Sequence, residues 1–152
     1  TTRAWWAQNA AVPADQRLIS PVIALPAGDL PLVLAFDAYH QYEVNGAANC
    51  YDGGFVEIST DGVNWLPLGN DRNLADPYLG IVTTGSSNPG GGNQGWCRQP
   101  PGGQSIQTVF LLDDFVGQNV QFRFRSTADA NTVGASPAGW GVDNVLVQSC
   151  ED

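Results

Sequence analysis

The chain has 152 residues, 43% of them hydrophobic, so it is long enough to bury the core of one domain but too short for a second large one. Fifteen acidic residues face six basic residues, all arginine, and the formal net charge is −9. This balance excludes nucleic acid and anionic lipid surfaces as expected partners, and the lack of lysine excludes Schiff-base and phosphate-loop lysine chemistry. No apolar run approaches the roughly 20 residues that cross a bilayer, so we expect no membrane insertion. Because there is no methionine and no signal-peptide pattern, we expect a processed or excised piece of a longer protein.

Hydrophobic alternation with a period of two predicts the first strands in chain order. Residues 17–25 are predicted as a strand that Pro21 confines to a sheet edge. Residues 32–43 alternate between a largely apolar face and a mixed one, as in a half-buried strand. Two further runs, 55–59 and 64–69, flank Asp61-Gly62, which predicts a tight hairpin turn.

The second half of the chain continues this pattern. Residues 105–112 and 119–126 are predicted as another strand pair, and 140–148 as the last strand. No amphipathic helix is evident, and the 18 glycines and 10 prolines punctuate short runs. The predicted fold is a single all-β domain over 1–152, an antiparallel two-sheet β-sandwich with jelly-roll topology. A long Gly-rich loop at about 70–103 is either an insertion over one end of the sandwich or a binding loop.

Three cysteines, Cys50, Cys97 and Cys150, cannot all pair within one chain. We favour a Cys50–Cys97 disulfide because each of the two lies beside a turn-rich stretch, and Cys150 is then free or pairs outside this chain. A disulfide indicates an extracellular or cell-surface location. Three reduced thiols are the alternative. A structural zinc site is not expected, since there is no CxxC and only one histidine.

The sequence contains no convincing catalytic constellation. His40 shares the apolar parity of its strand, which favours a packing role over a general base. No serine lies in a nucleophile elbow, and the adjacent Asp113 and Asp114 would point to opposite sides of a strand. Residues 90–95 lack the lysine and the strand–helix frame of a phosphate loop. We therefore expect a protein that is not an enzyme, with dispersed-acid hydrolysis as the competing hypothesis.

Carboxylates near strand ends are more informative, because oxygen ligands are those that Ca²⁺ prefers. Glu43 ends a strand, Asp52 precedes two glycines, and Asp143 shares parity with core-like valines of the last strand. An inward carboxylate must be paired, hydrogen-bonded or bound to metal. Asp37 and Asn144 are weaker candidate ligands. The alternative is that these acids only accept backbone N–H groups in turns.

Exposed tryptophans could stack on sugar rings. Trp5 and Trp6 near the start, and Trp96 in the long loop, are the candidate ligand-binding residues. The alternative for Trp5 and Trp6 is that they cover a sheet edge. Trp65 and Trp140 lie in strand contexts and are expected to pack.

Four segments together resemble a bacterial secreted module, namely 36–43, 50–62 with Trp65, 117–125 and 139–145. The module is similar to the MAM-like jelly roll and to the domain of immune inhibitor A-type metallopeptidases. The likeness runs from about Trp5 to Val147. It implies a non-catalytic β-sandwich accessory module of extracellular peptidases, adhesins or surface proteins, often with a structural calcium ion. By motif it assigns that ion to Glu43, Asp52 and Asp143, although Asn144 stands where a second Asp is common.

The sequence therefore predicts a secreted adhesion or binding module with structural calcium, whose partner is its parent multidomain protein, a surface partner or a glycan. A carbohydrate-binding module of a secreted hydrolase is a narrower version of this hypothesis. A subunit of an extracellular filament, self-assembling through strand edges and Cys150, is a separate one.

Overall fold

The computed structural model describes residues 3–28, 30–131 and 138–149 and consists mainly of strands. In these ranges the helices are two single 3-10 turns, η1 (Pro101–Gly103) and η2 (Asp113–Phe115). Over the same residues, no helix has the length and hydrophobicity that a membrane crossing requires. The all-β prediction is confirmed.

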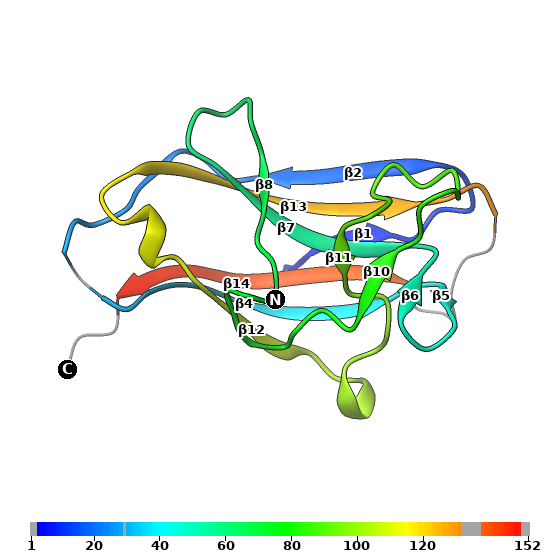
Figure 1. Cartoon of the computed structure of the whole chain (residues 1–152). Coiled ribbons are helices and arrows are strands. Elements are labelled where there is room, and N and C mark those ends of the chain that lie inside the picture. Colours follow the sequence, from blue (N-terminus) through cyan, green and yellow to red (C-terminus); the bar gives the residue numbers. More distant parts are fainter. Residues whose placement is uncertain (1–2, 29, 132–137, 150–152) are drawn as a thin grey trace.

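Two antiparallel sheets lie over each other, with β2, β13 and β7 in the upper layer of Figure 1 and β14, β4 and β12 in the lower. The first sheet has the strand order β1 (Trp5–Gln8), β14 (Gly139–Ser149), β4 (Leu32–Gln41), β12 (Ile106–Leu111) and β9 (Asn73–Ala75). The second has the order β2 (Ala14–Ile19), β13 (Asn119–Ala128), β7 (Gly53–Ser59) and β8 (Leu66–Pro67), and β3 (Ile23–Ala24) also pairs with β13. The predicted antiparallel sandwich is confirmed, whereas its jelly-roll connectivity stays a prediction.

A third, small sheet crosses one end of the sandwich. Its order is β11 (Gln94–Gly95), β10 (Gly80–Val82), β6 (Asn49–Cys50) and β5 (Val44–Asn45), and the β10–β6 pair is parallel. The predicted disulfide is confirmed, because Cys50 bonds to Cys97 just beyond β11. The region expected to be one long loop thus carries β9, β10 and β11, and the disulfide ties it to β6.

Aromatic side chains from both sheets form the centre of the core. The Phe36 ring of β4 meets the Phe124 ring of β13 edge-on, with centroids 5.1 Å apart. Trp140 of β14 is fully buried beside the same Phe124 ring. Gly54 provides space for that indole, since a Cβ at position 54 would lie 2.7 Å from Trp140 Cε3. The inward direction of Phe36, on which this packing depends, agrees with the apolar alternation in residues 32–43.

The predicted pairing of the runs in the second half of the chain is wrong. The runs 105–112 and 119–126 do not pair with each other, because β12 pairs with β4 and β9 while β13 belongs to the second sheet. Their connection through η2 crosses between the layers.

The hairpin at Asp61-Gly62 exists but is wider than a two-residue turn, since Ile58 pairs with Leu66. Asp61 Oδ1 accepts the backbone N–H groups of Val63 and Asn64, at 2.8 and 2.7 Å, and these bonds hold the wider loop. Pro21 lies between β2 and β3, so the run 17–25 is broken there, and β2 is an edge strand as predicted.

Candidate metal centre

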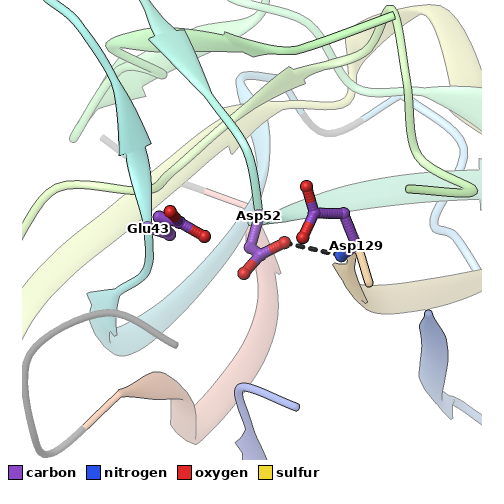
Figure 2. A group of neighbouring side chains, drawn as sticks. All are labelled: Glu43, Asp52 and Asp129. Atoms are coloured by element: carbon purple, nitrogen blue, oxygen red, sulfur yellow. Dashed lines mark hydrogen bonds between the residues drawn. The ribbon is translucent and has the colours of Figure 1, made fainter. Parts of the chain in front are cut away.

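Three carboxylates gather at the end of the sandwich that carries the small sheet. Glu43, Asp52 and Asp129 each offer one oxygen, and these oxygens all lie within 4.8 Å of one another. Figure 2 shows Asp52 between the other two, with its carboxylate directed at the backbone nitrogen of Asp129. Asp52 and Asp129 are buried, and Glu43 is half-buried.

The β5–β6 hairpin brings Glu43 and Asp52 together. Val44 pairs with Cys50 at the base of this hairpin, so the residues just outside it face each other. The Glu43 carbonyl accepts the N–H groups of Tyr51 and Asp52, at 3.0 and 3.3 Å. The disulfide at Cys50, two residues before Asp52, fixes the hairpin against residue 97.

Asp52 also holds two other segments. Its Oδ1 accepts the backbone N–H of Asp129 at 2.7 Å, which fastens the end of β13. Its Oδ2 accepts Nδ2 of the buried Asn9, just after β1, at 2.9 Å. One carboxylate therefore connects the ends of β1, β13 and the β5–β6 hairpin.

The electrostatics of the cluster are unfavourable without a cation. Burial raises the pKa of Glu43, and the charges of Asp52 and Asp129 raise it further. Burial also raises the pKa of Asp52, and the charge of Asp129 adds to this, while the hydrogen bonds from Asp129 and Asn9 oppose it. The arrangement thus penalises the ionised forms of Glu43 and Asp52.

The arginines of the chain neutralise other acids. Across the described ranges, their ion pairs go to Asp15, Glu57, Asp71 and Asp114. Buried Glu57 is the useful contrast, because Arg123 Nε lies 2.5 Å and Arg125 Nη1 3.3 Å from its carboxylate. Glu43, Asp52 and Asp129 have no such pair within the part of the chain that the structure covers.

Two buried oxygens at the cluster have no hydrogen-bond partner among the described residues. They are Glu43 Oε2 and Asn9 Oδ1, the second on the amide group that contacts Asp52. An unsatisfied buried acceptor costs about 1–3 kcal/mol, so such atoms need an explanation. A cation bound among the three carboxylates would supply one for Glu43 Oε2.

Without divalent cation, we expect this cluster to destabilise the fold as pH rises. A carboxyl whose pKa is raised by folding stabilises the native state below its unfolded pKa, and that contribution is lost as pH rises through the folded pKa. Glu43→Gln should therefore be more stable than the parent at pH 7 and nearly equal to it at pH 4, as measured by urea unfolding in chelator.

The pKa of Asp15 shifts in the opposite direction to that of Glu43, so its effect on stability also changes with pH in the opposite direction. The parent is therefore compared with a variant that keeps Asp15. Burial alone would raise its pKa, but hydrogen bonds from Arg17 and Arg125 lower it to about 2, so its contribution is lost as pH falls from about 4. The contribution of Asp15 is the same in the parent and in Glu43→Gln, so it cancels in the difference between their free energies of unfolding. A Glu43→Gln variant that is less stable than the parent at pH 7 in chelator would contradict the predicted repulsion.

The structure separates the five predicted ligands into two groups. Glu43 and Asp52 lie in the cluster, whereas Asp37, Asp143 and Asn144 lie on the outer face of the first sheet. Asp37 pairs with Asp143 across β4 and β14, and Asn144 Nδ2 donates to Asp37 Oδ2 at 2.7 Å. Asp37 precedes Glu43 by six residues, which span up to roughly 20 Å of extended chain, so the two groups lie at different places along the sandwich.

The predicted inward direction of Asp143 is therefore wrong. The register of β14 shifts between Asp143 and Leu146, so the parity shared with Val145 no longer indicates the core. Val145 and Leu146 are 41% and 55% exposed, and the buried side chains of this strand are those of Trp140 and Val142.

Sequence reasoning missed Asp129 and Asn9. Strand β13 continues two residues past the predicted end, to Ala128, and its pairing of Thr127 with Gly53 brings Asp129 next to Asp52. Antiparallel pairing of the runs 55–59 and 119–126 in this register would have indicated Asp129. No local signal distinguishes Asn9.

The predicted sugar-stacking role of Trp96 needs correction, since the residue is 1% exposed. Its indole packs against Tyr78 and His40, and its Nε1–H donates to the Asp76 carbonyl at 2.9 Å. Trp5 is half-buried and packs edge-on against Trp140, whereas Trp6 is exposed and stacks on Tyr39. Cys150 lies outside the described residues.

His40 is a buried packing residue, as its parity indicated. Its Nδ1 lies 2.6 Å from the Arg98 carbonyl and its Nε2 3.1 Å from Asp76 Oδ2. Both ring nitrogens are thus engaged within the fold.

No family model matches the chain, and no curated protein matches it either.

Proposed function

We propose that this chain is a non-catalytic extracellular β-sandwich module whose loop-bearing end is locked by one structural calcium ion at Glu43, Asp52 and Asp129. The observation that carries the proposal is the convergence of these three carboxylates, two of them buried, without an arginine partner in the described ranges. The unpartnered Glu43 Oε2 supports it, because a cation held by this carboxylate would give that oxygen a partner.

Calcium fits this ligand set better than magnesium or zinc. The candidate ligands are all oxygens, and Ca²⁺ coordinates six to eight oxygens at about 2.3–2.6 Å. Two oxygens on opposite sides of such an ion are thus about 5 Å apart, and the three cluster oxygens lie close enough, within 4.8 Å of one another, to share one ion. Mg²⁺ requires shorter, octahedral bonds, and Zn²⁺ prefers nitrogen and sulfur ligands.

The ion would connect segments that are distant in sequence. Its ligands follow β4, precede β7 and follow β13, and Asn9 brings in the end of β1. Binding would offset the repulsion among the carboxylates and make folding depend on the calcium concentration of the surroundings. The buried disulfide, which fits an oxidising compartment, is consistent with an extracellular setting where calcium is abundant.

The non-catalytic part of the proposal is supported by the surroundings of the groups that were considered as possible catalysts, His40 and the pair Asp113 and Asp114. Both His40 nitrogens face acceptors inside the fold. Asp113 Oδ1 accepts the N–H of Leu32, and Asp114 pairs with Arg72, so this acid pair has structural partners.

The test is an NMR titration of the isotope-labelled chain with CaCl₂ at pH 7 after dialysis against chelator. We expect a single site with Kd of roughly 10⁻⁴–10⁻³ M, as in other extracellular modules, and the largest shifts at Asn9, Glu43, Asp52 and Asp129. Glu43→Gln should weaken binding at least about tenfold. Asp71→Asn, which removes an exposed acid elsewhere, is the matched control and should bind like the parent. Shifts spread over all exposed acids, or equal binding by Glu43→Gln, would refute the site.

A further inference from the structure

The outer face of the first sheet carries an aromatic shelf built by Trp6, Gly141 and Tyr39. These residues pair in register across β1, β14 and β4, so they form one row across the sheet. Gly141 has no side chain, and the Trp6 ring lies over it, because a Cβ there would be 3.1 Å from Trp6 Cε3. The Trp6 and Tyr39 rings are inclined by only 28°, with centroids 6.0 Å apart. The indole of Trp6, which stacks on Tyr39, is 43% exposed, so it is the flat apolar part of the shelf that solvent reaches.

The next row along the strands is acidic. Asp37 and Asp143 pair directly, and with the shelf and Ser105 they line a hollow of about 280 Å³. Both side chains are partly exposed, and no ion pair within the described ranges reaches either of them. These carboxylates are strong acceptors beside a flat apolar surface.

Neutral amides extend the polar rim on the other side of Tyr39. The Tyr39 hydroxyl donates to Gln41 Oε1 at 2.7 Å and accepts from Gln99 Nε2 at 3.0 Å. These bonds fix the phenol ring in place. The face therefore combines a fixed aromatic surface with carboxylates and amides.

From these observations we propose that the hollow binds one ring of a neutral glycan, stacked on the exposed Trp6 indole that Tyr39 supports and donating hydroxyl hydrogens to Asp37 and Asp143. This inference rests on the proposed role as a binding module but not on the calcium site. The C–H face of a pyranose is apolar and flat, whereas its rim consists of hydroxyl donors, so it complements both rows. The two carboxylates would repel uronic or sialic acids. A quaternary ammonium ion is less suited, because it is recognised by rings that surround it, and these two rings are nearly parallel.

The experiment is a titration of the calcium-saturated chain with defined probes, followed by NMR. The neutral probes are cellohexaose, xylohexaose, mannohexaose and chitohexaose, while sialyllactose tests an anionic sugar and phosphocholine tests a quaternary ammonium group. We expect at least one neutral oligosaccharide to bind, with shifts at Trp6, Tyr39 and Asp37. Trp6→Ala should weaken that binding by at least about tenfold. Trp65→Ala, which removes an indole that precedes β8 and packs against Arg123, is the matched control and should bind like the parent.

Gly141→Ala is a second variant that keeps both aromatic residues but displaces the indole, and it should also weaken binding. No binding of any neutral probe, equal binding by Trp6→Ala and Gly141→Ala, or preference for phosphocholine or sialyllactose would overturn the inference. The shifts at Glu43 and Asp52 are recorded while each sample is first saturated with calcium. Failure of sugar binding is therefore distinguishable from failure of the calcium site.

Discussion

Calcium should raise the melting temperature of this chain by roughly 5–10 °C at a concentration about a hundred times its Kd. A ligand that binds only the folded state contributes about 2.7 kcal/mol at that excess, and each kcal/mol moves the melting point of a chain of this size by about 2–4 °C. The affinity that sets this Kd would come from relief of the repulsion among the three carboxylates and from a partner for Glu43 Oε2. Differential scanning calorimetry with CaCl₂ and with chelator measures it.

The same experiment contains its controls. MgCl₂ at equal ionic strength should give a much smaller increase, and Asp71→Asn should respond to calcium like the parent. The calcium increment should also shrink as pH falls through the raised pKa values of Glu43 and Asp52, because protons compete for the ligand oxygens. An equal increase with magnesium, or an increment that grows on acidification, would contradict specific binding at this cluster.

Removal of the Cys50–Cys97 disulfide should cost about 4 kcal/mol, which lowers the melting temperature by roughly 10–15 °C. The bond closes a loop with a sequence separation of 47 residues, and the entropy of the unfolded chain rises when that loop opens. Both half-cystines are buried, so the replacements Cys50→Ala and Cys97→Ala also lose packing. Urea unfolding of the double variant, made in a Cys150→Ser background to prevent disulfide exchange, measures the difference.

This variant also tests how the two features are coupled. Because Cys50 precedes Asp52 by two residues, loss of the disulfide should weaken calcium binding as well as stability. A destabilisation below about 1 kcal/mol would mean that the small sheet holds residue 97 without the covalent bond. Unchanged calcium affinity would mean that the β5–β6 hairpin alone positions Asp52.

The sequence predicted the fold well where alternation was long and the side chains were unambiguous. The run 32–43 is such a case, since its apolar parity from Leu32 to Tyr42 corresponds to buried residues in the structure. Pairing partners were harder to predict, because β12 and β13 have similar patterns but belong to different sheets. Short strands such as β10 and β11 depend on the disulfide and on neighbouring backbone, so no local period marks them.

The candidate site was predicted only in part for the same reason. Glu43 and Asp52 flank a hairpin, and this local relation is visible in the sequence around Gly46 and Cys50. Asp129 comes from the second sheet, so its place depends on the register of β13 against β7. Asp143 was misplaced because a register shift in β14 cancelled the parity on which the prediction relied.

The most direct measurement is a crystal structure of the chain grown with calcium, with anomalous differences collected at a long wavelength. We expect one calcium peak at about 2.3–2.6 Å from carboxylate oxygens of Glu43, Asp52 and Asp129. Carboxylates that point apart at full calcium saturation, or a peak confined to other acids such as Asp37 and Asp143, would contradict it.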